Sequence, residues 1–172
     1  MIEQGANALV SFGLAGGLDP VLRPGTRIVP SAVLSNGEAL RPAPELAARF
    51  GGLTGHTVLA GATVVADAAA KRRLFVATRA HAIDLESGTV ASIARGYGLP
   101  FVVVRAICDS AERDLPPAAL VALGLEGRIG LMAVVRSLVQ RPDQVVGLMA
   151  LAWDAALARR ALIRVTQQFR AS

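Results

Sequence analysis

An apolar run at residues 100–104, Pro-Phe-Val-Val-Val, constrains the fold of this chain more than any other feature. Consecutive apolar residues after a proline predict a strand that is buried on both faces. Strands of this kind belong to parallel sheets that are covered by helices on both sides. A carboxylate, Asp109, stands where this strand is expected to end, before a polar loop and two prolines. Such a position calls for a chemical or a structural reason.

Strand and helix patterns alternate along the chain before this run. We expect strands at 8–12, 26–34, 57–62 and 81–85, and helices at 45–50, at 87–97 and from the capping residue Asp67 to about Thr78. A glycine-rich turn is expected at 13–17, where Gly16 and Gly17 would adopt positive φ or allow close backbone approach. This alternation predicts an α/β fold with a mixed, largely parallel central sheet flanked by helices.

The length and composition fit a single domain. The chain has 172 residues without a linker-like stretch, and 53% hydrophobic but only 4% aromatic residues imply a core built mainly from Ala, Val and Leu. We expect one domain over residues 1–172, with the motif-bearing part at 8–115 and a helical C-terminal tail at 131–168.

The tail carries two helix patterns. A first helix is expected at 131–139, and Pro142 suits the first turn of a long helix that reaches about Gln168. An apolar stripe on this helix predicts that it covers the sheet; its members are Val145, Leu148, Met149, Ala152 and Ala156. A helix that contacts a lipid surface or a partner is the second interpretation.

The net charge of +5 comes almost wholly from arginine, because Lys71 is the only lysine. The arginines are scattered and no aromatic residues interleave with them, so we expect no nucleic-acid partner. A solvated basic face, with some attraction for anionic ligands or for peripheral contact with a membrane surface, is the simpler interpretation.

The sequence also indicates a cellular location. Cys108 is the only cysteine and excludes an internal disulfide, and the first residues lack the pattern of a signal peptide. The apolar stretch at 144–153 is well short of the ~20 residues that a spanning helix needs. We expect a cytoplasmic protein.

Three segments place distinctive residues at the ends of predicted strands: the glycine turn at 13–17, Asp-Leu-Glu-Ser at 84–87, and the pair Cys108 and Asp109. Ligands of open α/β sheets bind in the crevice beyond strand ends, so the three segments are expected to converge on one pocket. The glycine turn lacks the G-x-G-x-x-G spacing of a dinucleotide site, which argues against that ligand.

These segments resemble motifs of the nucleoside phosphorylase and nucleosidase superfamily. The matching stretches are F-G-L-A-G-G-L at 12–18, I-D-L-E-S at 83–87 and V-V-V-R-A-I-C-D-S-A-E at 102–112, in the family's order and spacing. The stretch at 11–20, the L-P-P-A-A-L loop and the arginine-rich tail are most similar to hopanoid-associated phosphorylases. The resemblance implies a nucleoside phosphorylase-like fold, cleavage of a purine nucleoside, and release of adenine from adenosylhopane in hopanoid biosynthesis.

The resemblance also implies roles for two carboxylates. Breaking an N-glycosidic bond passes through a ribosyl cation-like state and needs an acceptor near the sugar and an acid for the departing base. Glu86 matches the position that accepts hydrogen bonds from the ribose hydroxyls, and Asp109 matches the acid that protonates purine N7. To hold a proton at neutral pH, Asp109 would have to be desolvated or share a proton. The structural alternatives are a turn cap for Asp109 and a favourable first-turn charge for Glu86.

Weaker candidates surround these two residues. Asp84 matches the outer acidic residue of the family motif, with an exposed strand-end charge as the alternative. Val64 and Val65 match positions where backbone groups meet the purine, with core valines as the alternative. Gly13 and Gly16 are the substrate-binding glycines that the resemblance implies.

Other residue types point to no cofactor. His56 and His81 lack partners at metal-ligand spacing, so we expect no metal site and two structural histidines. Cys108 is interpreted as a small packed residue rather than a nucleophile. The resemblance implies no organic cofactor.

Two departures from the family pattern affect the functional interpretation. Leu14 stands where many relatives carry Ser or Thr, so phosphate as a co-substrate is less secure than glycosidic cleavage, although the turn backbone can bind an anion. Few residues precede the first predicted strand, and we expect an N-terminally truncated chain that forms a homo-oligomer through its exposed edge. The alternative function is a catalytically incompetent nucleoside-binding or assembly subunit.

Overall fold

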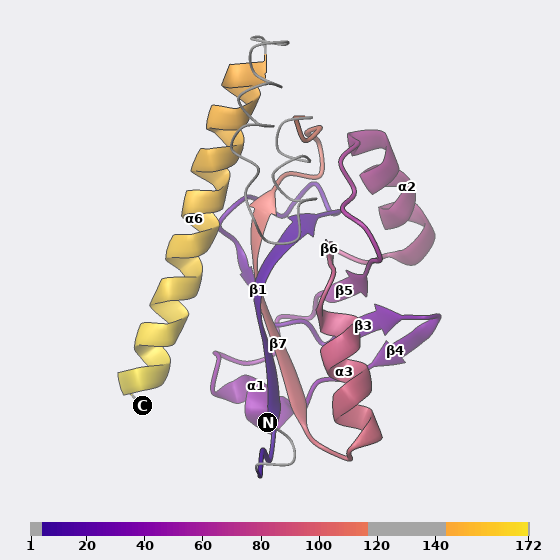
Figure 1. Cartoon of the computed structure of the whole chain (residues 1–172), viewed down its shortest axis with the longest axis vertical. Coiled ribbons are helices and arrows are strands. Elements are labelled where there is room, and N and C mark those ends of the chain that lie inside the picture. The colour runs from indigo at the N-terminus through magenta and orange to yellow at the C-terminus, as the bar shows by residue number, and fades with distance from the viewer. Residues whose placement is uncertain (1–4, 117–143, 172) are drawn as a thin grey trace.

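The computed structural model describes residues 5–116 and 144–171. Within them, a seven-stranded sheet has the order β2-β7-β1-β6-β5-β3-β4 (Figure 1). The strands are β1 (Leu9–Gly17), β2 (Arg27–Ile28), β3 (Ala32–Ser35), β4 (Glu38–Leu40), β5 (Thr57–Ala60), β6 (Ala82–Asp84) and β7 (Phe101–Asp109), and the helices are α1 (Pro44–Ala48), α2 (Ala68–Thr78), α3 (Ser87–Gly96) and α6 (Gln144–Ala171).

The parallel pair of β1 and β7 forms the centre of the fold. β7 is buried along nearly its whole length, as the apolar run predicted. Val102 and Val104 pack in a cluster with Val165 of α6, whereas Val103 packs in a cluster with Ala91 of α3. Helices therefore cover both faces of β7, with α6 and α3 on opposite sides in Figure 1.

The sheet is mixed, which confirms the predicted fold class. β1 and β7, β3 and β5, and β5 and β6 pair in parallel, whereas β1 and β6, β2 and β7, and β3 and β4 are antiparallel. β6 pairs with β1 through Gly16 and Gly17, at the carboxyl end of β1. The end of β6 therefore lies directly beside the glycine-rich end of β1.

The glycine-rich segment is part of a strand, and the prediction of a turn at 13–17 is wrong. Its residues continue the pairing of β1 with β7, from Gly13 opposite Arg105 to Gly16 opposite Asp109. The glycines do not reverse the chain direction; they let β1 lie close to the end of β7. A Cβ atom at Gly17 would lie 3.0 Å from the backbone oxygen of Asp109. An anion-binding turn is therefore not formed at this position.

The predicted strand at 26–34 is divided into β2 and β3. Pro30 lies between them and lacks the N–H that a continuous ladder requires. β2 pairs with β7, and β3 pairs with β5. β4 was not predicted; it joins β3 through Asn36 and Gly37, both at positive φ. An Asn-Gly pair is a strong hairpin signal and could have predicted this turn.

Three of the predicted helices are present with small changes at their ends. Asp67 caps α2 by accepting a hydrogen bond from the backbone N–H of Ala70 at 2.6 Å, as predicted. α3 ends at Gly96 and α1 at Ala48, each slightly before the predicted end. α3 packs closely on the sheet, since a Cβ atom at Gly88 would lie 2.5 Å from Cβ of Ala60.

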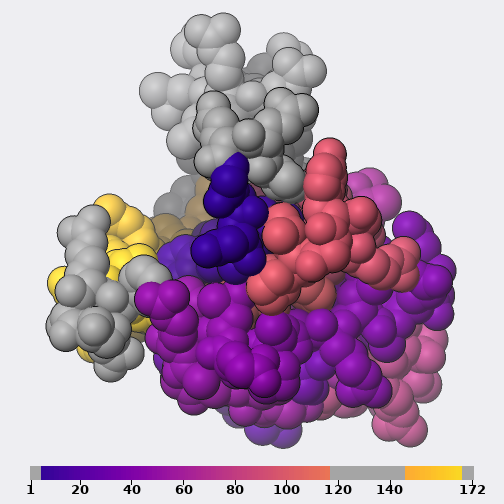
Figure 2. Space-filling view, turned by 90° about the horizontal axis from the view of Figure 1, so that it is seen from below, coloured from indigo at the N-terminus to yellow at the C-terminus, as the bar shows by residue number. Residues whose placement is uncertain are grey.

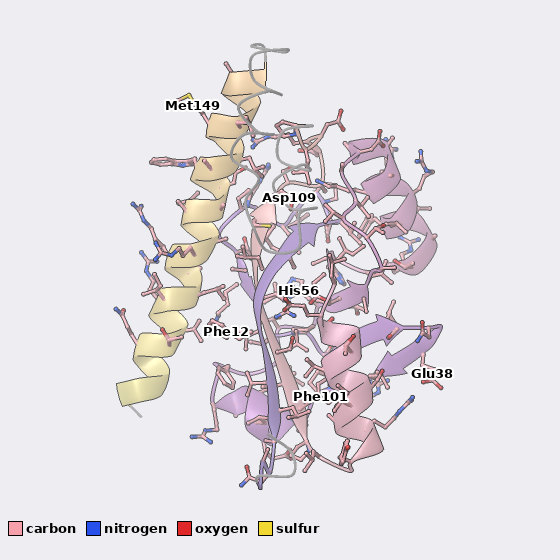
Figure 3. All side chains as sticks on the ribbon, in the orientation of Figure 1. Phe12, Glu38, His56, Phe101, Asp109 and Met149 are labelled. Carbon is pink, nitrogen blue, oxygen red and sulfur yellow. The ribbon has the colours of Figure 1, made fainter. Side chains whose placement is uncertain are left out.

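α6 covers the sheet, but not with the predicted stripe. Ala158 and Val165 are buried, whereas Met149 is 68% exposed, and Ala152 and Ala156 are also exposed. Figure 3 shows Met149 pointing away from the sheet and Phe12 between β1 and α6. The inward face of the helix also carries a buried charged residue, Asp154.

Asp154 sets the orientation of α6. Its carboxylate is buried and accepts from Nη1 of Arg113 at 2.5 Å. A buried carboxylate needs such a partner, which brings this face of α6 against the sheet. Among the described helices, none combines the length and apolar character needed to cross a membrane. The helix predicted at 131–139 lies outside the described residues.

Candidate active site at the ends of β6 and β7

A β-bulge sets the position of Asp109 at the end of β7. Ala15 pairs with Ile107, whereas the next residue, Gly16, pairs with Asp109, so Cys108 is an extra residue in β7. Bulges redirect side chains and are common beside active sites. A Cβ atom at Gly16 would lie 3.1 Å from Oδ1 of Asp109. The absence of a side chain at Gly16 therefore makes room for the Asp109 carboxylate, in line with the close approach expected at this glycine.

Asp109 forms a buried ion pair with Lys71 of α2. Nζ of Lys71 lies 2.5 Å from Oδ2 of Asp109, and the two side chains are 0% and 8% exposed. The same ammonium donates to the carbonyl oxygens of Ser110 at 2.9 Å and Arg113 at 3.0 Å. Charge-assisted hydrogen bonds of this kind are strong and directional, so Lys71 fixes the orientation of the Asp109 carboxylate.

The thiol of Cys108 contacts the other oxygen of the same carboxylate. Sγ donates to Oδ1 of Asp109 across 3.4 Å. Burial, followed by the charge and the hydrogen bond of Asp109, raises the pKa of the Cys108 thiol to about 12. The thiol is therefore protonated at neutral pH, in agreement with a packed residue that is not a nucleophile.

The turn after β7 does not use Asp109 as a cap. The hydroxyl of Ser110 accepts a hydrogen bond from the backbone N–H of Glu112 at 3.2 Å. The Asp109 carboxylate instead reaches across to α2. The carboxylate is thus directed into the protein. Figure 3 labels Asp109 at the carboxyl end of β7.

A second buried ion pair lies at the end of β6. Nε of Arg105 is 2.5 Å from Oδ2 of Asp84, and Nη2 of Arg105 donates to the hydroxyl of Ser11 at 2.6 Å. The other Asp84 oxygen accepts from the N–H and the hydroxyl of Ser87 and from the N–H of Glu86. Asp84 is buried, so the alternative of an exposed strand-end charge is wrong. Both of its oxygens are already engaged by the protein.

Glu86 lies next to this pair, and its carboxylate is largely exposed. Its side chain is 72% exposed, and Oε2 lies 3.6 Å from Nη2 of Arg105. Glu86 occupies the N-cap position of α3, but its side chain makes no capping hydrogen bond, a task that Asp84 performs. The carboxylate is therefore open to an external hydrogen-bond donor.

Strand β1 passes close to both carboxylates. A Cβ atom at Gly13 would lie 3.7 Å from Oε2 of Glu86, and one at Gly16 would lie 3.1 Å from Oδ1 of Asp109. Three strand residues span ~10 Å. The residues of the three segments singled out in the sequence thus lie close to one another along β1; that they form one pocket stays a prediction.

Val64 and Val65 lie on the loop between β5 and α2, which borders this group. Val65 packs in a core cluster with Leu18 and Ile83, whereas Val64 is 39% exposed. The loop is tied at its start by a hydrogen bond from the N–H of Gly61 to the carbonyl of Asp84, at 2.7 Å. A core role is therefore visible for Val65, and Val64 is the more accessible of the two.

The two histidines form hydrogen bonds with neighbouring threonines and pack against one another. Nδ1 of His81 accepts from the N–H of Thr57 at 3.0 Å, and Nδ1 of His56 lies 2.8 Å from the hydroxyl of Thr54. Their rings meet edge to face, with centroids 5.2 Å apart. Among the described residues, no group of three metal-ligating side chains is found.

Sequence reasoning missed three polar residues of this group: Lys71, Arg105 and Ser11. Signals for two of them were present. Arg105 interrupts a continuous apolar strand, and Lys71 is the only lysine of the chain, in the first turn of a helix. A charged residue among buried neighbours almost always has a partner, so each could have been assigned one.

Two shallow hollows of the described surface lie elsewhere. One is lined by residues that include Leu40, Arg95 and Phe101, and the other by residues of α2 that include Arg72 and Val76. Figure 2 shows the end of the molecule at which β1 and β7 begin, where the first hollow lies, opposite the end that carries Asp109.

Residues 53–123 match the family model described as the Phosphorylase superfamily, and this segment contains Glu86 and Asp109. No match was found among curated proteins. The family match therefore covers the strands β5 to β7 with Glu86 and Asp109, but it leaves out β1 and is less than half of the chain.

Solved structures of nucleosidases share the fold. A candidate methylthioadenosine nucleosidase of Weissella paramesenteroides matches with a TM-score of 0.64 and 17% identity, over 99% of this chain and 72% of that chain. Futalosine hydrolase of Helicobacter pylori matches with a TM-score of 0.61 and 16% identity, over 97% of this chain and 70% of that chain. S-adenosylhomocysteine nucleosidase of Streptococcus pyogenes, in complex with 5-methylthiotubericidin, matches with a TM-score of 0.57 and 23% identity, over 64% and 58%.

These similarities establish a nucleoside phosphorylase-like fold. With the nucleosidase structures of Streptococcus pyogenes and Colwellia psychrerythraea, the match spans 58% and 56% of the length of the solved chain. The identities are low, so the likeness concerns the fold alone.

Proposed function

We propose that this chain cleaves the N-glycosidic bond of a purine nucleoside, with Glu86 binding the ribose hydroxyls and Asp109 donating a proton to the leaving base. The observation that supports it is the placement of both carboxylates along β1, beside Gly13 and Gly16. The match of residues 53–123 to the Phosphorylase superfamily gives independent support.

The two carboxylates have environments that suit different tasks. Glu86 is exposed and can accept hydrogen bonds from two hydroxyl groups. As the glycosidic bond breaks, positive charge develops on the sugar, and a nearby carboxylate stabilises that charge more than it stabilises the neutral substrate. Asp109 is buried beside the same strand, next to Gly16, and in this proposal it faces the base of a nucleoside bound along β1.

Arg105 and Asp84 serve as positioning residues in this proposal. Asp84 caps the start of α3, where Glu86 stands, and Arg105 joins that carboxylate to β7. The guanidinium also lies 3.6 Å from the Glu86 carboxylate. Substrate contact is therefore assigned to Glu86, with Asp84 holding the start of its helix.

One feature favours a second candidate function, nucleoside binding without cleavage. The Lys71 ammonium donates to Asp109, and a carboxylate paired in this way has no proton of its own for a leaving base. A protein of this kind would bind adenosine or adenine and release no product. Calorimetric titration beside a base-release assay separates the two candidates.

The finer substrate assignment is the adenosyl group of adenosylhopane. It rests on the resemblance of residues 11–20 to hopanoid-associated phosphorylases. The exposed side chains of Met149 and Trp153 on α6 offer an apolar surface on which a lipid-linked substrate could rest. A soluble adenosine that lacks the lipid group would then be a poorer substrate.

The test is a base-release assay with purified protein, adenosine, methylthioadenosine and adenosylhopane, each with and without phosphate. We expect release of adenine, and Asp109→Asn should abolish most of it while partly sparing 4-nitrophenyl riboside, whose leaving group needs no protonation. Ribose 1-phosphate as the second product indicates phosphorolysis, and free ribose indicates hydrolysis. Absence of base release from all three nucleosides contradicts the proposal.

A further inference from the structure

The buried Lys71 ammonium has two backbone carbonyl acceptors in addition to its ion-pair partner, Asp109. Lys71 is fully buried in the first turn of α2, while the neighbouring Arg72 and Arg73 are exposed. A positive charge is disfavoured there both by burial and by the helix dipole. The chain nevertheless keeps its only lysine at this position.

The other charged groups near Lys71 are engaged elsewhere. Asp67 caps α2 through the N–H of Ala70, and Asp114 accepts from the N–H of Ala68. The guanidinium of Arg113 pairs with Asp154 of α6, so only its backbone carbonyl faces Lys71. Asp109 is therefore the carboxylate that Lys71 serves.

The hydrogen bonds around Nζ are complete whether the shared proton is on Lys71 or on Asp109. An ammonium has three N–H donors, and the structure offers Asp109 Oδ2, Ser110 O and Arg113 O. If one proton moves to Asp109, the neutral amine keeps two N–H donors for the two carbonyls, and its lone pair accepts the O–H of Asp109. No buried polar group loses its partner in either state, so the proton can move at little cost in hydrogen bonding.

We propose that Lys71 holds the proton that Asp109 delivers to the leaving purine, an inference that rests on the proposed function. The Nζ–H bond breaks and an O–H bond forms on Asp109. A half-turn about Cβ–Cγ, a soft and two-fold torsion, then directs that O–H to purine N7. As the N-glycosidic bond breaks, the proton passes to N7 and its electron pair stays on Asp109. The pair is left as an amine and a carboxylate, and the proton that the attacking water or phosphate loses as it bonds to the sugar restores the ammonium.

The first test compares two variants of Lys71 on two substrates. Lys71→Met keeps a long side chain without a proton, and Lys71→Arg keeps the charge but does not give up its proton at working pH. We expect kcat for adenosine to fall roughly a hundredfold in both, with a much smaller fall for 4-nitrophenyl riboside. Arg72→Met, one residue further on the exposed face, is the control and should match the native chain.

A merely structural role gives a different result. Both substrates would then lose activity together, in proportion to a fall in melting temperature, and the charge-preserving arginine would restore activity. Adenosine turnover at the native rate in either Lys71 variant also overturns the relay. Such a result would leave the proposed function intact, whereas a native chain that releases no base from any purine nucleoside removes both.

A second test needs no variant, because the only lysine gives a single signal in protein labelled with ¹⁵N-lysine. The carbocyclic analogue of adenosine presents N7 as an acceptor and resists cleavage, whereas its 7-deaza counterpart has carbon at that position. We expect the Lys71 nitrogen to change from ammonium to amine with the first ligand and to stay ammonium with the second. An ammonium signal in both complexes overturns the relay.

Discussion

Arg105 and Asp84 join the two strands that carry the candidate site, with Nε of Arg105 2.5 Å from Oδ2 of Asp84 and both side chains buried. The second oxygen of Asp84 caps α3, at the residue after Glu86. One carboxylate therefore sets the distance between β7 and the start of α3, and with it the position of Glu86.

The first prediction concerns this link. Asp84→Asn keeps the shape of the side chain but removes the buried counter-charge of Arg105 and leaves only the exposed Glu86 carboxylate, 3.6 Å away, which should lower the free energy of unfolding by about 3–5 kcal/mol. Urea unfolding measures the change. Glu38→Gln is the control, because Glu38 pairs with Arg95 at the surface, where such pairs contribute about 0–1 kcal/mol. Equal losses in the two variants would contradict a special role for Asp84.

The second prediction concerns Glu86. Glu86→Gln removes the charge and one acceptor oxygen, so kcat/KM for a purine nucleoside should fall more than about tenfold, or roughly 1.4 kcal/mol. The side chain is 72% exposed, so the free energy of unfolding should change by less than about 0.5 kcal/mol. Glu45→Gln, on the exposed side of α1, should change neither quantity. Unaltered kinetics in Glu86→Gln would remove this residue from the site.

The third prediction uses the reactivity of Cys108. Its pKa is raised to about 12, chiefly by burial, so the thiolate fraction at pH 8 is about a thousandfold below that of an ordinary thiol with pKa 9.0. Iodoacetamide should therefore modify the folded protein very slowly at pH 8 and the urea-unfolded protein quickly. Because the chain has one cysteine, a single mass increase reports the reaction. Rapid modification of the folded chain would refute the assigned environment.

Much of the sheet could be predicted because its strands have strong local signals. The apolar run at 101–104 required burial on both faces, and Asp67 and the positions after it indicated α2. The turn at 13–17 was mispredicted because glycine favours turns locally, whereas here the pairing with β7 and the need for space beside Asp109 decide the conformation. At Gly16, pairing with Asp109, a residue 93 positions further along the chain, outweighs the local preference of glycine for a turn.

The site residues likewise divide into those with a local sequence signal and those that depend on long-range contacts. Glu86 and Asp109 were identified because they occupy short motifs at strand ends. Lys71 belongs to no motif, and its contact with Asp109 exists only because α2 folds back over the end of β7. The orientation of α6 was mispredicted for a related reason, since the buried Asp154 carboxylate and its contact with Arg113 lie on the face turned inward, whereas Met149 of the apolar stripe is exposed.

The fourth prediction concerns the pH dependence of stability. Burial, then the charge of His81, lower the pKa of His56, while Asp19 acts in the opposite direction. A histidine whose pKa is lower in the folded state binds protons more readily when unfolded, so stability is full above ~6.5 and falls as pH drops through the folded value. Melting temperatures between pH 8 and 5 should fall more steeply for the native chain than for His56→Asn. Parallel curves would contradict this assignment.

The last prediction concerns the close approach of Gly16 to Asp109. A methyl group at position 16 would lie 3.1 Å from Oδ1 of Asp109 and 3.5 Å from a methyl group of Ile83, so the carboxylate has to move by a few tenths of an ångström. Lys71 holds the opposite oxygen at 2.5 Å, so that movement also disturbs the ion pair. Gly16→Ala should therefore lower kcat for a purine nucleoside about tenfold or more, because small displacements of a reacting group have large effects on rate.

The backbone at position 16 has no positive φ, so alanine introduces no strain there beyond the contact itself. The melting temperature should therefore fall only slightly, and the kinetic loss should be smaller for 4-nitrophenyl riboside, which needs no proton from Asp109. Gly96→Ala is the matched control, since nothing lies within 4 Å of a Cβ atom there, and it should leave both rates unchanged. Native kinetics in Gly16→Ala would show that the position of the Asp109 carboxylate does not limit the reaction.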